Sequence, residues 1–227
     1  MRALPLRRGA RGVRRGGHLV PGRSERGVID EAVAAIRAGR PVVLPTDTVY
    51  GLCADAESES AAREVARLKG RAEQQPIAVL ARDVDRLLER IPELDARVLR
   101  VLLPGPYTLI LSNPKRRYPW LGGGDTIGVR VPDLPAATAA VLEEVGVVLA
   151  TSANLHGGRD PRRADEVPEE IRRGAAVLVD GGELPGTSST VLDLTGPEPR
   201  LVREGAVPAA QALSNALAAG ASAGERT

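Results

Sequence analysis

The stretch Pro41–Leu52, PVVLPTDTVYGL, carries the clearest signal of fold and site in this chain. An apolar run, Val42–Leu44, stops at Pro45, and the next five residues bring two threonines, an aspartate and a tyrosine. A buried strand that gives way abruptly to polar side chains is typical of a ligand site at the end of a strand in an α/β sheet. An ordinary strand end with Asx and Ser/Thr turn bonding is the alternative.

The same pattern recurs twice further along the chain. The apolar run Val147–Leu149 leads into the polar sequence TSAN at residues 151–154, and the hydroxyl cluster GTSST at residues 186–190 precedes another apolar run. Each cluster alone is compatible with a turn or a helix cap. Three of them in one chain favour a shared polar site.

Apolar periodicity predicts helices and strands that interleave throughout the chain. The predicted helices are residues 29–38, 60–68 with Ser60 as N-cap, 83–90, 95–103, 136–144 and 208–217. The predicted strands are residues 42–44, 77–80, 107–111, 127–131, 147–149, 177–179, 191–194 and 201–202. This alternation predicts one α/β domain over residues 28–207, followed by a C-terminal helix and a frayed tail in residues 208–227.

Charge is distributed unevenly along the 227 residues. Residues 1–27 hold eight arginines and one glutamate, a balance of +7, and are expected to form a disordered leader. The other 200 residues hold 23 basic and 28 acidic groups, a balance of −5. The basic character of the chain therefore comes from the leader, which could contact tRNA or double-stranded RNA weakly.

Several functional classes are disfavoured by what the sequence lacks. Cys53 is the single cysteine and there are two histidines, so neither a disulfide nor a Cys/His metal site is expected. No apolar stretch approaches the roughly 18 residues that cross a bilayer, which with the single cysteine predicts a cytoplasmic protein without a membrane partner. The GxxxxGK[ST] and GxGxxG phosphate loops are also absent, so a nucleotide would need another kind of cradle.

Two groups of basic residues stand out against this background. The chain has two lysines against 29 arginines, and one of the two, Lys69, lies two residues before Arg71. A compact ammonium beside a planar guanidinium suits a polyphosphate, and the alternative is a solvated helix end where the cations complement the helix dipole. Arg130 alternates with Val129 and Val131 on a predicted strand, so its partner is a structural carboxylate or that of a ligand.

Taken in order, these segments resemble one known family. PTDTVYGL, KGR, PGPYTLIL, TIGVRVP, TSANLHG and SSTVLDL, spread from about Ile29 to Gly205, occur as in the YrdC-like proteins, the L-threonylcarbamoyladenylate synthases. The resemblance implies the short, single-domain form of that family. It implies an α/β fold whose twisted, mostly parallel sheet, flanked by helices, lines a large concave cavity.

The resemblance also implies roles for individual residues. The implied ATP-binding residues are Lys69, Arg71, Gln75, Thr126, Asn154 and Arg203, of which Lys69 and Arg71 would act electrostatically on the phosphates. The implied threonine-binding residues are Thr48, Arg130, Ser152 and Ser189, with Arg130 holding the threonine carboxylate. No protein metal ligand and no general base is implied.

The implied reaction joins L-threonine, bicarbonate and ATP into L-threonylcarbamoyl-AMP and releases pyrophosphate, with Mg²⁺ accompanying ATP. A separate transferase complex would then carry the threonylcarbamoyl group to tRNA. One alternative is a tRNA- or double-stranded-RNA-binding module without synthase activity. A second is the carbamoyl-adenylate chemistry of the related domains in hydrogenase-maturation carbamoyltransferases.

Overall fold

The computed structural model describes residues 13–15, 18–20, 24–72 and 75–224 of the chain. Most of the leader lies outside this range, so its expected disorder stays a prediction. Its described part contains β1 (Val13–Arg15) and β2 (His18–Val20), which pair antiparallel. Helix α1 begins at Glu25, so regular structure starts before the expected domain boundary at residue 28.

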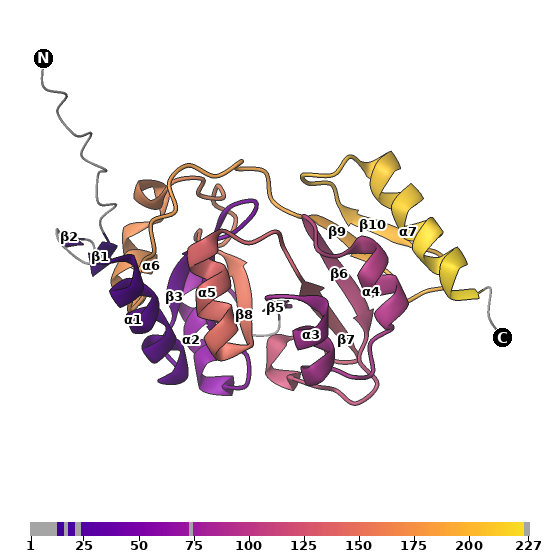
Figure 1. Cartoon of the computed structure of the whole chain (residues 1–227), viewed down its shortest axis with the longest axis horizontal. Helices are drawn as coiled ribbons and strands as arrows, with labels where there is room; N and C mark the ends of the chain where they lie inside the picture. Colours follow the sequence, from indigo (N-terminus) through magenta and orange to yellow (C-terminus); the bar gives the residue numbers. More distant parts are fainter. Residues whose placement is uncertain (1–12, 16–17, 21–23, 73–74, 225–227) are drawn as a thin grey trace, which may run out of the picture.

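An eight-stranded sheet forms the centre of the molecule (Figure 1), in the order β10-β9-β6-β7-β5-β8-β4-β3. Its strands are β3 (Val42–Pro45), β4 (Tyr50–Asp55), β5 (Ala78–Ala81), β6 (Tyr107–Ser112), β7 (Thr126–Arg130), β8 (Val147–Ser152), β9 (Thr190–Asp193) and β10 (Arg200–Arg203). The single α/β domain is confirmed. The expectation of a mostly parallel sheet is wrong, because five neighbouring pairs are antiparallel and only β5-β7 and β6-β9 are parallel.

The mostly parallel sheet was implied by the resemblance, and strand β4 was not expected. Gly51 lies inside strand β4, and the polar turn after β3 reverses the chain into an antiparallel hairpin. The run Val177–Val179 was expected to be a strand, but it lies beside β3 through a single bridge between Val43 and Leu178. Strand β4 and residues 177–179 are both extended, but β4 forms a ladder with β3 whereas residues 177–179 make a single bridge to it.

The helices are α1 (Glu25–Arg37), α2 (Glu59–Lys69), α3 (Val84–Arg90), α4 (Ala96–Leu102), α5 (Ala136–Val145), α6 (Glu169–Gly174) and α7 (Ala209–Gly224). Two short 3₁₀ turns lie in connections, η1 (Pro119–Leu121) between β6 and β7 and η2 (Ala164–Glu166) between β8 and α6. Helix α6 was not expected. The tail was expected to fray from Ala218, but the described helix α7 continues to Gly224. The N-cap of α2 is Ser58 and not Ser60, while Gly70 ends that helix in the left-handed conformation, as expected.

Two apolar cores lie on opposite faces of the sheet. The larger core contains a buried residue from seven of the eight strands and is covered by α2, α3, α4, α6 and α7. The smaller core lies under α1 and α5 and reaches only β3, β4, β5 and β8. Among the described helices, none therefore packs a buried residue onto this face over β7, β6 and β9, and this uncovered half-face is where a ligand site can form.

Candidate ligand-binding cavity

A cavity of about 260 Å³ opens over the half of the sheet that α1 and α5 leave uncovered. Its floor is formed by alternate residues of β7 and β6, including Thr126, Gly128, Arg130 and Thr108. The intervening residues, such as Val129 and Leu109, face the larger core on the other side. The period of two in strand β7 was visible in the sequence, and it places Arg130 on the cavity side as expected.

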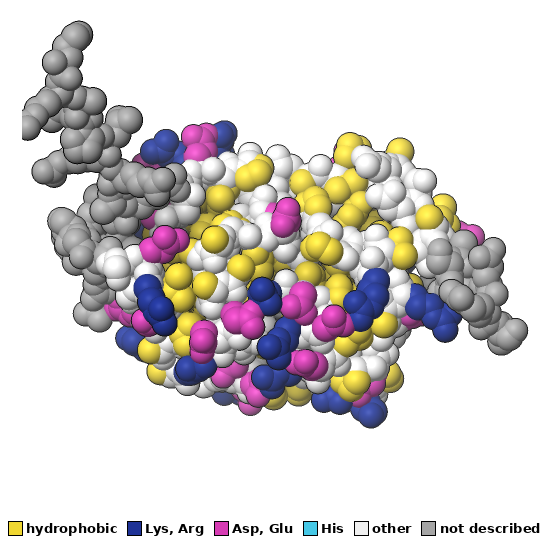
Figure 2. Space-filling view, in the orientation of Figure 1, with side chains coloured by type: hydrophobic (Ala, Val, Ile, Leu, Met, Phe, Trp, Pro, Cys, Tyr) yellow, Lys and Arg dark blue, Asp and Glu magenta, His cyan; other side chains and the backbone are white. Residues whose placement is uncertain are grey.

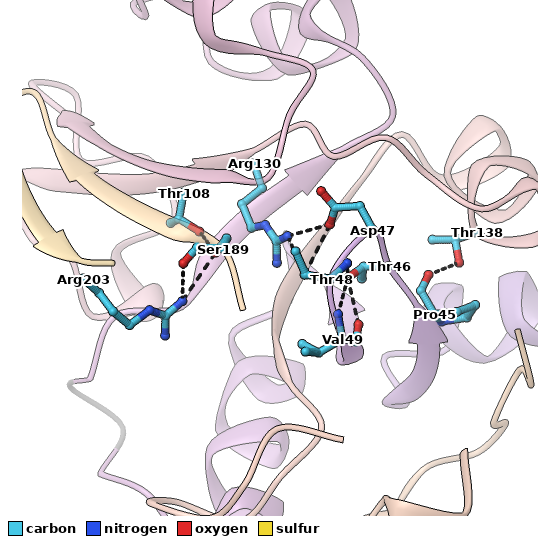
Figure 3. Close-up of polar contacts among 10 residues, drawn as sticks. All are labelled: Pro45, Thr46, Asp47, Thr48, Val49, Thr108, Arg130, Thr138, Ser189 and Arg203. Atoms are coloured by element: carbon cyan, nitrogen blue, oxygen red, sulfur yellow. Dashed lines mark hydrogen bonds and ion pairs between the residues drawn. The ribbon is translucent and has the colours of Figure 1, made fainter. Parts of the chain in front are cut away.

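Arg130 donates through Nη2 to the carboxylate of Asp47, 2.9 Å away, and to the hydroxyl of Thr48 at 3.3 Å (Figure 3). The two charged side chains are 12% and 9% exposed. Burial raises the pKa of Asp47 and lowers that of Arg130, while their mutual attraction opposes both changes. The sequence left open whether Arg130 pairs with a structural carboxylate or with that of a ligand, and in the structure it pairs with the structural carboxylate of Asp47.

The turn that holds Asp47 and Thr48 is built by the hydroxyl of Thr46. This hydroxyl donates to the carbonyl oxygen of Val49 at 2.7 Å and lies 3.3 Å from the backbone nitrogen of Thr48. The preceding residue, Pro45, accepts a 2.6 Å hydrogen bond from Thr138 of α5, which ties this turn to the helix (Figure 3). Ser/Thr turn bonding and a polar site were the two alternatives for this segment. The structure contains the hydroxyl-bonded turn, and the same turn directs Asp47 and Thr48 toward Arg130.

A second cluster joins Lys69, at the end of α2, to the end of β8. Its ammonium donates to the carbonyl oxygens of Ser152 and Asn154 at 2.5 and 2.8 Å and to Oδ1 of Asn154 at 2.7 Å. The Ser152 hydroxyl donates to the same Oδ1 at 2.7 Å. Burial, with a smaller contribution from Arg71, lowers the pKa of Lys69 to about 8, and Asp160 opposes the change.

These contacts occupy all three donors of the Lys69 ammonium. Arg71 likewise donates to the carbonyl oxygens of Gln75 and Pro76, and burial lowers its pKa. Neither cation lines the cavity directly, although Ser152 and Asp160 do. The two residues expected to hold phosphates therefore hold the backbone of the cavity wall in this state.

A third cluster closes the opposite wall. The hydroxyls of Ser189 and Thr108 lie 2.8 Å apart, and Arg203 on β10 donates to the Ser189 carbonyl oxygen at 2.8 Å. Figure 3 shows Arg203 reaching toward Ser189 from one side of the site, with Arg130 on the other. The guanidinium of Arg203 contributes to lowering the pKa of Arg130, so the two cations share one electrostatic environment.

The ten residues singled out by the resemblance thus form three clusters and one separate position. Thr126, the separate one, lines the cavity and donates to the carbonyl oxygen of Gly123 at 2.9 Å. Five of the ten line the cavity: Thr126, Arg130, Ser152, Ser189 and Arg203. Asp47, Thr108 and Asp160 were missed as site residues. The alternation of Thr108 with Leu109 on a predicted strand could have indicated it, whereas Asp160 lies in a loop without a periodic signal.

In the described part of the chain, no group of three or more His, Cys, Asp or Glu residues could hold a metal ion. No helix among the described residues is long and apolar enough to cross a membrane.

Fold and cavity together define an α/β protein with a polar cavity on the uncovered half of a mixed sheet. A family model described as "Telomere recombination", which covers Sua5, YciO and YrdC proteins, matches residues 34–205. This match extends over more than half of the chain, which therefore belongs to the Sua5/YciO/YrdC family.

The chain is similar to proteins named threonylcarbamoyl-AMP synthase and to a solved structure of a Sua5 protein. A putative threonylcarbamoyl-AMP synthase of Mycobacterium tuberculosis is 34% identical over 82% of this chain and 88% of its own length. The human threonylcarbamoyl-AMP synthase is 37% identical over 73% of this chain and 62% of its own. The crystal structure of Pyrococcus abyssi Sua5 complexed with L-threonine superposes with a TM-score of 0.75 at 33% identity and covers 85% of this chain. This chain in turn spans 58% of that one.

Proposed function

We propose that the protein synthesises L-threonylcarbamoyl-AMP from L-threonine, bicarbonate and ATP, with release of pyrophosphate. The observation that carries this proposal is the cavity with Arg130 on its floor in a chain similar to a Sua5 that was crystallised with L-threonine. The product serves a transferase complex that modifies tRNA with the threonylcarbamoyl group.

Arg130 is the residue that holds the threonine carboxylate in this proposal. Its Nη2 is occupied by Asp47 and Thr48, and among the described residues Nη1 has no hydrogen-bond partner. Asp47 and Thr48 hold the guanidinium at Nη2, which leaves Nη1 and Nε as donors for the carboxylate. Thr48, Ser152 and Ser189 supply hydroxyl contacts to the rest of the amino acid.

ATP occupies the part of the cavity between Thr126 and the Lys69 cluster. Lys69 and Arg71 provide positive potential behind the wall, Gln75 and Asn154 contact the nucleotide, and Arg203 lies on the opposite side. Charge that develops on the leaving pyrophosphate is stabilised by these fixed cations. Asp160 is the one carboxylate that lines the cavity, which suits Mg²⁺, since this ion binds one or two carboxylates together with substrate phosphates.

The test is an assay with threonine, bicarbonate, Mg²⁺ and ATP that detects pyrophosphate and the AMP adduct. Release that depends on threonine supports the proposal, and its absence rules the synthase out. Arg130→Lys should raise the KM for threonine with a smaller effect on that for ATP. Arg200→Lys is the matched control, because Arg200 is a 74% exposed arginine on β10.

The RNA-binding alternative receives no support from the surface shown in Figure 2, where basic and acidic side chains intermingle without a patch of one sign. Exposed arginines are also paired with carboxylates, as in Arg82–Glu143 and Arg100–Asp85. Salt-dependent tRNA binding without ATP turnover would nevertheless favour it. Carbamoyl phosphate, offered in place of threonine, tests the carbamoyltransferase alternative in the same assay.

A further inference from the structure

We infer that Tyr118 is the wall of the cavity that stacks on the nucleobase of the nucleotide substrate. The inference rests on the proposed function and assigns a base-recognition role to a residue that no motif of the sequence indicated. It starts from the backbone around Tyr118, which adopts a conformation that side chains other than glycine rarely take.

Tyr118 has φ 52° and ψ 57°, and Arg116, two residues earlier, has φ 49°. These are the only non-glycine residues with positive φ in the described part of the chain. Left-handed backbone is uncommon for non-glycine residues and is unfavourable for a bulky side chain. Such conformations persist when surrounding contacts determine them, and they concentrate at ligand and active sites.

Hydrogen bonds and an ion pair hold the loop that precedes Tyr118. Asn113 donates through its side-chain amide to the carbonyl oxygen of Arg117 and accepts from the backbone nitrogen of Arg117, both at 2.9 Å. The Arg117 guanidinium binds both carboxylate oxygens of Glu93, at 2.9 and 2.8 Å. The residue between the two strained positions is therefore held by its backbone and by its side chain, which fixes the direction in which Tyr118 leaves the loop.

The Tyr118 ring is also supported from behind. It meets Trp120 edge-to-face, with ring centroids 6.2 Å apart, and the Trp120 indole donates to the carbonyl oxygen of Ala56 at 2.9 Å. Tyr118 itself lines the cavity. An edge-to-face contact covers at most one face of either ring, so it leaves at least one face of Tyr118 available for offset stacking.

The position of this ring matches the base end of a nucleotide. Tyr118 shares the cavity wall with the apolar residues Leu121 and Ile127, next to Thr126 at the start of β7. Arg130 lies at the other end of the same strand, roughly 13 Å away at about 3.3 Å per residue. The cavity thus has an apolar, aromatic end and a cationic end, which matches the proposed product, since its base lies at one end and the carboxylate of its threonyl group at the other.

The experiment compares nucleotide binding by the whole chain and its variants in titration calorimetry. Trp120 is the only tryptophan of the chain, so its fluorescence reports locally on ligands that reach Tyr118. Tyr118→Leu should bind ATP about tenfold more weakly or worse, since base stacking on an aromatic contributes roughly that much. Its affinity for inorganic triphosphate should stay unchanged, and the preference for ATP over CTP should shrink.

Two variants separate the ring from the strained loop. Tyr118→Phe keeps the ring and should bind ATP within about twofold of the wild type. Arg116→Gly relieves the neighbouring strained position without touching the ring, and it should leave the ATP affinity unchanged.

Wild-type affinity for ATP in Tyr118→Leu overturns the inference alone, and so does an equal loss of ATP and triphosphate binding. Failure of the wild type to bind ATP overturns the inference and the proposed function together.

Discussion

Asp47 was noticed in the sequence only as part of a polar turn, yet it is the counter-charge of Arg130. Their pairing spans 83 positions of the chain. A local pattern contains no information about a partner so distant, so the sequence left structural and ligand carboxylates open. The structure makes Asp47 a positioning residue whose effect on threonine acts through the guanidinium.

Removing the Asp47 charge should be costly. Asp47→Asn leaves the buried Arg130 guanidinium without a counter-charge and should lower the free energy of unfolding by ~3 kcal/mol. Arg130→Met, made alone and together with Asp47→Asn, completes a double-mutant cycle in denaturant unfolding. A coupling energy of about 1–3 kcal/mol is expected, and additive effects would contradict the pairing. Arg200→Met removes an ion pair whose arginine is largely exposed, and it should cost less than about 1 kcal/mol.

Lys69 attracted attention as a rare lysine, and the structure gives this lysine a buried ammonium with three protein acceptors. Its pKa is about 8 in the folded protein, against an ordinary 10.5. Between these values the unfolded chain binds a proton that the folded chain has released. Stability from this group is therefore complete above pH 10.5 and is lost as the pH falls through 8.

The free energy of unfolding should consequently rise between pH 8 and pH 10.5 in the wild type relative to Lys69→Met. Urea unfolding across this range measures the difference between the two proteins. Lys115→Met is the matched control, because Lys115 is the other lysine of the chain and is 66% exposed. It should keep the wild-type slope. Parallel profiles for the wild type and Lys69→Met would show that Lys69 titrates as it does in water.

The N-cap of helix α2 is Ser58, two residues before the serine that the sequence pattern indicated. Two serines two positions apart both have the side chain that an N-cap requires, and propensity alone does not choose between them. The structure selects Ser58, whose hydroxyl accepts from the backbone nitrogen of Ala61 at 3.2 Å. Since this helix ends at Lys69, its start and the cavity wall are parts of one element.

The cap can be tested with its own internal control. Ser58→Ala should lower the free energy of unfolding by ~1 kcal/mol, because the backbone N–H of Ala61 loses its acceptor at the helix start. Ser60 lies within the first turn of the helix, and Ser60→Ala should lower the free energy of unfolding by only a few tenths of the loss in Ser58→Ala. Thermal and denaturant unfolding of both variants gives the comparison. Equal losses would mean that Ser60 shares the capping role through its 3.0 Å contact with Ser58.

Strand β4 shows where sequence reasoning about elements stopped. Seven of the eight strands of the main sheet were located closely, because each is a short apolar run bounded by turn residues. In β4 a glycine follows a polar turn, and glycine usually weakens a strand. A Cβ added at Gly51 would lie 3.4 Å from the side chains of Thr46 and Cys53, so this strand position leaves little room for a larger residue. Strand β4 takes part in two of the five antiparallel pairs, with β3 and with β8.

One eight-stranded sheet organises the molecule, with an apolar core on each of its two faces. Every strand from β3 to β9 contributes to the larger core, and the smaller core shares four of them. The family resemblance, and not the periodicity, had implied a cavity. Composition and periodicity do not reveal that two helices cover only half of one face, because that depends on strand order.

This architecture predicts a single unfolding transition. Leu142→Ala opens space in the smaller core under α5 and should cost ~2–5 kcal/mol. Trp120 packs against the larger core, so its fluorescence follows the other side of the sheet. Its midpoint should shift together with that of the far-ultraviolet circular dichroism. If the Trp120 transition stays in place while the dichroism shifts, the two sides unfold separately.

The uncovered half of the sheet also has a consequence for the protein between catalytic cycles. A helix in that place would stabilise the fold at all times, whereas a ligand does so only while it is bound. Occupancy at a hundred times the dissociation constant adds about 2.7 kcal/mol to the free energy of unfolding. We therefore expect resistance to proteolysis to follow nucleotide and amino-acid supply, so that starvation for either substrate shortens the lifetime of the protein.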